Sequence, residues 1–294
     1  MSTGSRQPAG STEMRRRRDE RSRQPDRRQT LYGGSLRTLA IATVVMIGLA
    51  LGLAFFYAPE EATEGFLQRI FYLHVPLAIV CLAGFVAAGA MAIMHLRTRD
   101  PRWDLRSYVA IHMSLIFGIG VLICGSIWAK GSWGHWWVWS EPTLVSFLII
   151  ILLYATYQPL RFSIEDPERQ ARYASVFAIT AGAFVPLNFI AVRLSTAYLH
   201  PRVLGSSKLP GPMAFTFLIS LIAFALLYIT LWRFEMTAKH ARWQLKALRR
   251  KLSGEEAPAR RRSVEPELGA PSGSSSAPLG EPALTTPMIG RQAP

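Results

Sequence analysis

Tryptophan is concentrated in one short stretch of the chain, residues 128–142, which holds five of the eight tryptophans in 294 residues. Tryptophan is bulky and amphipathic, so such a cluster either anchors a segment at a membrane surface or builds an aromatic floor for a flat ligand. Four of the five fall within seven residues, a density that weakens the interpretation as a simple interfacial belt. These four candidates for a ligand floor are Trp133, Trp136, Trp137 and Trp139.

Three of the six histidines, His74, His135 and His200, lie at one end of the predicted membrane helices. Imidazole is the usual protein ligand of haem iron, and two imidazoles on opposite sides of the iron give a six-coordinate site. Haem is an apolar disc with two carboxylates, so it needs aromatic faces for its ring and cations at one edge. The cations available at this end of the helices are Arg69, Arg193, Arg202 and Lys208.

Each of these residue types also has a simpler interpretation. A lone loop histidine such as His200 is more often a solvated side chain than a ligand, and His135 suits interface packing better than ligation. Arginines near the ends of membrane helices commonly extend to lipid headgroups, and interfacial tryptophans commonly form a belt. From the residues alone, a haem site and an aromatic belt therefore both stay open.

Six apolar runs must position these residues. The chain is 50% hydrophobic and has a mean hydropathy of +0.20, and a helix of about 20 apolar residues crosses a hydrocarbon core of about 30 Å. Pro142 suits the first turn of the fourth helix, which we expect to end before Pro159. We predict an all-α integral membrane protein with six transmembrane helices at about residues 36–58, 70–96, 108–130, 142–157, 173–193 and 213–233.

The distribution of lysine and arginine predicts the orientation of these helices, because cytoplasmic loops are enriched in both residues. Near the helix ends, one side carries nineteen lysines and arginines, and the other carries five. Both termini are therefore predicted to be cytoplasmic, and the tryptophan-rich stretch is predicted to lie on the outer face. His112, in the third predicted helix, then lies towards the cytoplasmic side.

The remaining composition indicates two tails around one membrane domain. Residues 1–35 are predicted to be a disordered basic tail, residues 36–235 the six-helix membrane domain, and residues 236–294 a basic juxtamembrane segment followed by a disordered tail. The net charge of +14 sits mostly in tails and short loops, so a lipid bilayer is a better partner than nucleic acid. Cys81 and Cys124 lie inside apolar runs without a Cys-x-x-Cys motif, which excludes a c-type cytochrome, a thioredoxin-like reductant and a zinc module.

Several segments resemble the haem exporter protein C type of cytochrome c assembly protein, a haem-handling family with a tryptophan-rich WWD motif. The resemblance rests on residues 133–139 (WGHWWVW), on residues 69–76 (RIFYLHVP) and on His200 in the last outer loop. It covers roughly residues 36–235. The family usually closes its motif with an aspartate and then a basic residue. This chain instead has Ser140, Glu141 and Pro142, so its nearest acid is one position late and no basic residue follows.

The resemblance implies that the WWD loop and two flanking histidines hold haem transiently, as a b-type group, on the extracytoplasmic face for delivery to a haem chaperone. By matching position, His74 and His200 become the expected axial ligands and the four tryptophans the expected haem-facing loop. The expected location is the bacterial inner membrane. Partners that the resemblance allows beyond the chaperone are an ABC-type transporter complex and a small membrane subunit.

Other classes of protein remain open at this stage. A cytochrome c synthase attaches haem itself, but typically has more spans and a larger outer region. A b-type electron carrier would hold haem between histidines deep in the helices, and His112 lies towards the wrong end to pair with His74. A small-solute transporter with an aromatic belt would bind no haem. No Gly-x-x-x-x-Gly-Lys is present, so any nucleotide use belongs to another subunit. We therefore predict an assembly factor, not an enzyme.

Overall fold

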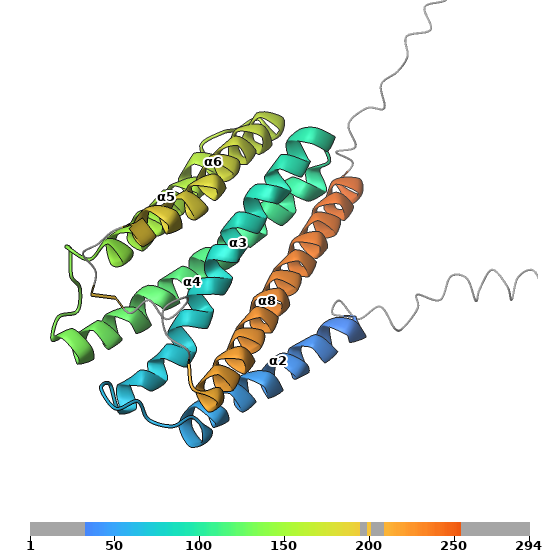
Figure 1. Cartoon of the computed structure of the whole chain (residues 1–294). Coiled ribbons are helices and arrows are strands. Elements are labelled where there is room, and N and C mark those ends of the chain that lie inside the picture. The colour runs from blue at the N-terminus through green and yellow to red at the C-terminus, as the bar shows by residue number, and fades with distance from the viewer. Residues whose placement is uncertain (1–32, 195–198, 201–208, 254–294) are drawn as a thin grey trace, which may run out of the picture. The chain divides into compact units, whose positions relative to one another are not determined.

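The computed structural model describes residues 33–194, 199–200 and 209–253, and these are helical apart from short connections and one isolated bridge between Glu61 and Gly65. The chain divides into two units, residues 1–247 and 248–294, and the contacts described below lie within the first. Figure 1 shows the helices in order. They are α2 (Gly34–Gly52), continued by a π-helical turn (Leu53–Tyr57), a 3-10 turn (Phe66–Ile70) leading into α3 (Phe71–Thr98), α4 (Pro101–Trp133), α5 (Pro142–Phe162), α6 (Pro167–Leu194) and α8 (Gly211–Leu252).

The six predicted spans are confirmed within the described residues, as six helices long and apolar enough to cross a membrane. The predicted start of the third span, at residue 108, is wrong: α4 begins at Pro101. The side chain of Asp100 accepts a hydrogen bond of 2.9 Å from the backbone N–H of Arg102, and proline at the first helical position needs no hydrogen-bond partner. This cap starts the helix about two turns before its predicted apolar run. The predicted tails lie largely outside the described residues.

Two predicted helix ends are also wrong. The fourth span was expected to end at residue 157, but α5 continues through Pro159 to Phe162, because a proline in the last turn removes only one hydrogen bond. The sixth was expected to end at residue 233, but α8 continues to Leu252. Charged residues end an apolar run without ending a helix, and the segment after Arg233 has no glycine or proline before Gly254.

Helix α3 is the element against which α4 and α6 pack most extensively. The main hydrophobic core lies along it and includes Cys81, Phe85 and Val121. The ring of Phe85 stacks on that of Tyr154 from α5, with centroids 3.8 Å apart. Glycines let α3 and α4 approach closely: a Cβ built at Gly120 of α4 would lie 2.8 Å from the Leu77 side chain of α3. Small residues at such contacts are typical of membrane helix packing.

Hydroxyl groups attach α8 and α2 to this core. The Tyr228 hydroxyl of α8 donates to the Ala110 carbonyl of α4 at 2.9 Å and also contacts the Ser114 hydroxyl at 3.0 Å. On the other side of α8, Thr230 bonds to Thr43 of α2 at 2.7 Å. Figure 1 shows α2 running beside α8 in this way. These hydroxyls within the spans are thus satisfied by neighbouring helices, as an apolar environment requires. His112 of α4 differs, because its Nδ1 is buried without a partner among the described residues.

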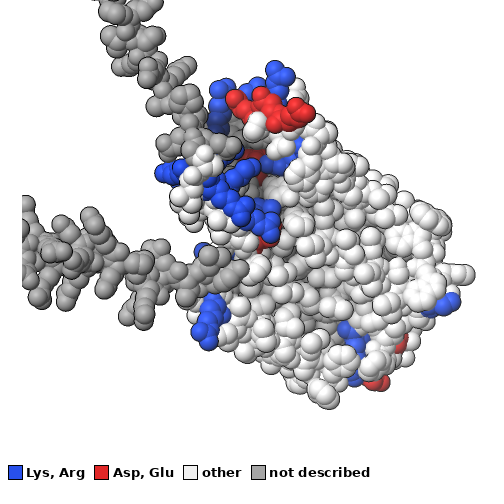
Figure 2. All heavy atoms as spheres, turned by 180° about the vertical axis from the view of Figure 1, so that it is seen from behind, with Lys and Arg blue, Asp and Glu red and all other residues white. Residues whose placement is uncertain are grey.

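The two ends of the helices carry different types of residue. Lys and Arg gather at one end, as Figure 2 shows from behind, and Figure 1 shows that this end holds the end of α3 and the turn between α5 and α6. The starts of α3, α5 and α8 and the ends of α4 and α6 lie at the other end, where the tryptophan-rich stretch joins α4 to α5. Which end faces the outside stays a prediction from the lysine and arginine distribution.

A buried ion pair joins α4 to α5 at the basic end. The guanidinium of Arg161 donates two hydrogen bonds to the carboxylate of Asp104, of 2.8 and 2.6 Å, and a third of 3.1 Å to the Tyr157 hydroxyl. The side chains of Arg161 and Asp104 are only 11% and 12% exposed. Gln170 of α6 donates to the Arg161 carbonyl at 2.8 Å. The polar cluster therefore ties three helices together.

Breaking this pair from one side should destabilise the protein strongly. Arg161→Met leaves the Asp104 carboxylate buried without its partner, so we expect the free energy of unfolding to fall by about 3–5 kcal/mol. The double variant Asp104→Leu/Arg161→Met should recover most of that loss. Arg172→Met, which breaks an exposed pair with Glu168, should cost less than about 1 kcal/mol. Denaturant unfolding of the detergent-purified protein measures all three, and equal stability of the single and double variants would contradict the expectation.

Candidate functional site

His74 lies near the start of α3 with its ring against α4. Its Nδ1 atom is 3.2 Å from the Cys124 sulfur, which leaves Nε2 as the ring nitrogen for a ligand. The ring fits here because the neighbouring residue of α4 is glycine. A Cβ added at Gly125 would lie 2.8 Å from His74 Cε1, closer than real Cβ contacts. Helix α4 therefore holds the His74 imidazole in one place.

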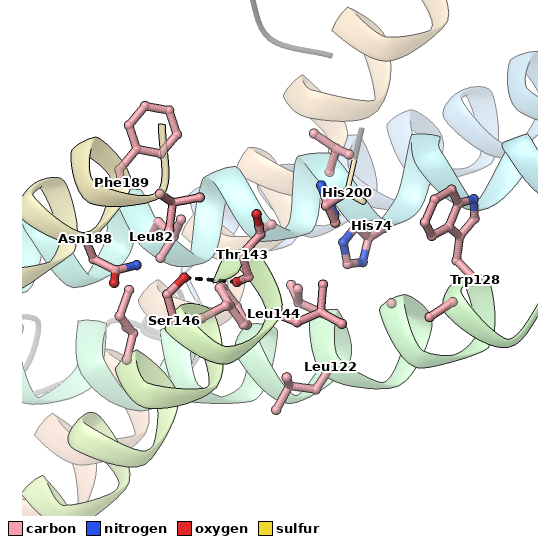
Figure 3. Close-up of a pocket in the computed structure, with 18 of the residues that line it drawn as sticks. His74, Leu82, Leu122, Trp128, Thr143, Leu144, Ser146, Asn188, Phe189 and His200 are labelled. Carbon is pink, nitrogen blue, oxygen red and sulfur yellow. Dashed lines mark hydrogen bonds between the residues drawn. The ribbon is translucent and has the colours of Figure 1, made fainter. Parts of the chain in front are cut away.

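His200 approaches this imidazole from the connection between α6 and α8. The two rings have centroids 6.3 Å apart and are tilted by 43°, and Figure 3 shows them side by side. The Trp128 ring of α4 lies 6.3 Å from the His200 ring. The chain thus brings together two histidines that are 126 positions apart in the sequence.

The histidine pair lies where two cavities adjoin. The first cavity, of about 240 Å³, lies among α3, α4, α5 and α6 and has a mostly apolar lining that includes Leu82, Leu122 and Leu144 (Figure 3). The second, of about 750 Å³, is bounded by residues 59–64 and by the starts of α3 and α8, and glutamates line it. His74, Trp128 and His200 line both cavities. A ligand held by the two histidines would therefore be accessible from two sides.

The four predicted tryptophans fall into two classes. Trp133 and Trp137 line the first cavity. Trp136 and Trp139 are 60% and 74% exposed and line neither cavity. The indole N–H of Trp137 is buried and has no hydrogen-bond partner among the described residues. A buried donor without a partner is costly in a protein and points to a missing acceptor, so this side of the first cavity suits a ligand with a polar or anionic group.

The four predicted cations are also divided. Arg193 lines the first cavity, with its guanidinium 5.0 Å from the centre of the Phe189 ring. Arg69 lines a different cavity among α2, α3 and α8, where it donates to the Ala54 carbonyl and pairs with Glu60 at 3.4 Å. It caps the end of the π-helical turn and does not line the histidine cavities. Arg202 and Lys208 lie outside the described residues.

Glu141 connects the tryptophan-rich stretch to the segment that carries His200. Its carboxylate accepts hydrogen bonds from the backbone N–H groups of Thr143 (3.2 Å), Leu199 and His200 (3.3 Å). The residue is 1% exposed. Burial alone would raise the pKa of Glu141, but the backbone donors, led by Leu199, outweigh it and lower the pKa below its ordinary value. The group is therefore an ionised carboxylate at neutral pH.

Three residues of the site were not predicted from the sequence. Trp128 lies on α4, five residues before Trp133, and its ring lies beside that of His200. Cys124 was interpreted as a buried apolar thiol, and it is buried, but it also contacts His74. Asn188 is a polar side chain on α6 that lines the first cavity (Figure 3). An amide within an otherwise apolar run was the one signal that could have found it. His135 is exposed and lines neither cavity.

The centroid separation of the pair is the one expected for an iron held between two imidazoles. Two metal–nitrogen bonds of about 2 Å, each extended by about 1 Å to the ring centre, place the centroids roughly 6 Å apart. The observed separation is 6.3 Å. No group of three or more histidine, cysteine or acidic side chains suited to a bare metal ion occurs among the described residues.

Comparison with known proteins gives consistent matches over most of the chain. The sequence model of the family described as Heme exporter protein C matches residues 20–251. A protein named Heme exporter protein C from Bradyrhizobium diazoefficiens is 32% identical over 213 residues, which cover 70% of this chain and 79% of the relative. The proteins of that name from Paracoccus denitrificans and Escherichia coli K12 are each 29% identical, covering 70% and 55% of this chain and 86% and 66% of the relatives.

Filling the space beside His74 should disturb the site without weakening the helix. Gly125→Ala favours helix by up to about 1 kcal/mol, yet its Cβ displaces the His74 ring. We expect haem, titrated into the purified protein, to bind at least about tenfold more weakly and with a smaller low-spin fraction. Gly48→Ala in α2, where a Cβ meets nothing within 4 Å, is the matched control and should leave binding unchanged. Equal behaviour of the two variants would show that the position of the His74 ring does not matter.

Proposed function

Because the chain belongs to the Heme exporter protein C family, we propose that it binds haem at the outer ends of its membrane helices and presents it to a haem chaperone during c-type cytochrome maturation. The family assigns the protein to haem handling in cytochrome c biogenesis, and it is a multi-pass protein of the inner membrane. Haem is the cargo of this protein. The proposal concerns which residues hold the cargo and what receives it.

The observation that carries the proposal is the pair formed by His74 and His200, with ring centroids 6.3 Å apart. One residue belongs to a helix and the other lies outside the described helices, so local sequence does not explain their meeting. Both line two adjoining cavities, and Trp128 lines both cavities with them. Haem iron supplies affinity for two axial nitrogen donors, and we assign these to the two histidines. We infer b-type binding, because the chain has no Cys-x-x-Cys motif for covalent attachment, and transient binding from the delivery role.

The polar groups of the two cavities favour one orientation of the cargo. Trp137, whose indole N–H is buried without a partner among the described residues, and Arg193 both line the first cavity. Carboxylates of Glu60, Glu61 and Glu64 line the second. Haem carboxylates are attracted by the donors and repelled by the acids. We therefore infer that the propionate edge points into the first cavity and the opposite edge faces the acidic side.

The residues of the site hold and orient the cargo, and no bond-making step is assigned to them. Trp133 and Trp137 would cover the ring, whereas Trp136 and Trp139 are exposed and suit contact with lipid or with a partner protein. The haem chaperone would approach from the outer face, and both termini would be cytoplasmic. We expect an ABC-type complex and a small membrane subunit as further partners within the membrane.

The ligand assignment is tested by absorption spectra of the detergent-purified protein, oxidised and reduced. The wild-type protein should show low-spin haem, and His74→Ala and His200→Ala should each convert it to high-spin haem because one axial nitrogen is lost. His135→Ala, at an exposed histidine of the tryptophan-rich stretch, is the control and should keep the low-spin spectrum. A colourless wild-type protein after haem-replete expression would favour a transporter with an aromatic belt. Covalent haem transfer to an apocytochrome by the purified protein alone would favour a synthase.

The division among the tryptophans gives a second prediction. Trp137→Phe keeps an aromatic ring in the first cavity but removes the unpartnered N–H, so haem affinity should fall by roughly tenfold, the value of one hydrogen bond to a charged group. Trp139→Phe is the matched control because Trp139 is exposed, and it should change affinity less than about twofold. Affinity is measured by haem titration at fixed detergent concentration. A larger effect at residue 139 than at residue 137 would reverse the assignment.

A further inference from the structure

We propose that Glu141 is a positioning residue that sets the axial ligand His200 opposite His74 by binding the backbone N–H groups of Leu199 and His200. The inference rests on the proposed function, because it names the residue that completes the two-histidine site. It assigns a role to an acid that lies one position after the place where the resembling motif has its aspartate.

The first argument is the burial of the carboxylate. Glu141 is 1% exposed, although it lies in a connection between two helices. An acidic side chain is almost never buried so completely without partners that compensate for the loss of water. Each of its two oxygens accepts at least one backbone N–H. The partners, not the surrounding apolar groups, therefore explain why the carboxylate is buried.

The second argument is what these partners join. Oε1 caps the first turn of α5 by accepting from the Thr143 N–H at 3.2 Å. Oε2 accepts from Leu199 and His200, which are 58 and 59 positions away in sequence. The Glu141 N–H donates to the Val138 carbonyl at 3.2 Å, which closes a turn of the tryptophan-rich stretch. One side chain thus fixes the stretch, the start of α5 and the His200 backbone relative to one another.

The third argument is that His200 belongs to none of the described helices, whereas His74 is held within α3 and against Gly125 of α4. A ligand to iron must be held to within a fraction of an ångström for a six-coordinate site to form. Backbone hydrogen bonds to an ionised carboxylate are among the stronger ones in proteins. The Glu141 carboxylate accepts two such hydrogen bonds, from the backbone N–H groups of Leu199 and His200. It therefore fixes the backbone from which the His200 ring extends.

The test separates this role from the capping of α5. Serine at an N-cap accepts from the helix N–H groups but is too short to reach Leu199. We therefore expect Glu141→Ser and Glu141→Ala to lose low-spin haem to a similar degree, and Glu141→Ser to unfold at nearly the wild-type denaturant concentration. Glu168→Ala, at an exposed acid of α6, should keep the wild-type spectrum. A wild-type spectrum for Glu141→Ser, with loss only for Glu141→Ala, would reduce Glu141 to a helix cap and overturn the proposal.

Combining variants shows whether Glu141 acts through His200. In the wild-type background, Glu141→Ala should weaken haem binding at least about tenfold. In the His200→Ala background the same change should alter affinity less than about twofold, because the ligand that it positions is already absent. In the His74→Ala background, where His200 is the remaining ligand, the effect should return in full. An equal loss in all three backgrounds would indicate a general structural role and contradict the proposal.

Amide hydrogen exchange tests the contact without haem. Peptides covering Leu199 and His200 should lose protection in Glu141→Ala and Glu141→Ser, but not in Glu168→Ala. Unchanged exchange at these amides would overturn the positioning role, whatever haem does. A wild-type protein that binds no haem, but whose exchange depends on Glu141, would instead refute the two-histidine haem site while leaving the contact established. The two failures are therefore distinguishable.

Discussion

The close approach of α3 and α4 is the constraint on which the rest of the protein depends. Glycines on α4 lie where α3 presents side chains: Leu77 packs where a Cβ at Gly120 would stand, and the His74 ring packs at Gly125. The core residues of α5, α6 and α8 pack against the surface that these two helices form together. The same contact places an imidazole at the outer end of an apolar interface.

The bilayer imposes a second constraint, which is visible in the polar groups within the spans. Asp104 and Arg161 neutralise each other, and hydroxyls on α8 donate to α4. No water is present in a hydrocarbon core to hydrogen-bond these groups, so other protein groups must do so. At the outer end the arrangement differs, because the Trp137 N–H is left without a partner among the described residues and cavities remain between the helices. Within α4, His112 Nδ1 is also buried without a partner among the described residues, and of these two residues it is Trp137 that lines a histidine cavity.

Sequence reasoning identified the elements better than their limits. Apolar runs predict these helices because a segment that crosses the membrane needs about 20 apolar residues and must pair its backbone hydrogen-bonding groups within itself. All six predicted helices are present in the structure. Their ends depend on single groups: the Asp100 cap began α4 early, and α5 continued past Pro159. For the site, the residue types of the tryptophan-rich stretch marked its location, but exposure of individual side chains depends on how the stretch turns. Arg69 looked equivalent to Arg193 in sequence, and only packing against α2 separates them. The contact of Cys124 with His74 spans 50 positions, and no local pattern records it.

The two histidines differ in how they are attached, and this has a consequence for release. His74 is a rigid arm, fixed by a helix and by the neighbouring glycine of α4. His200 is attached through backbone contacts outside the described helices, to Glu141 among others. Under the proposed function the pair would form a hemilabile chelate, with one rigid and one more easily displaced arm. An incoming donor would replace the weaker arm first, while the rigid arm retained the metal. Stepwise exchange of this kind would let a cargo pass from one protein to another without being free in water or lipid.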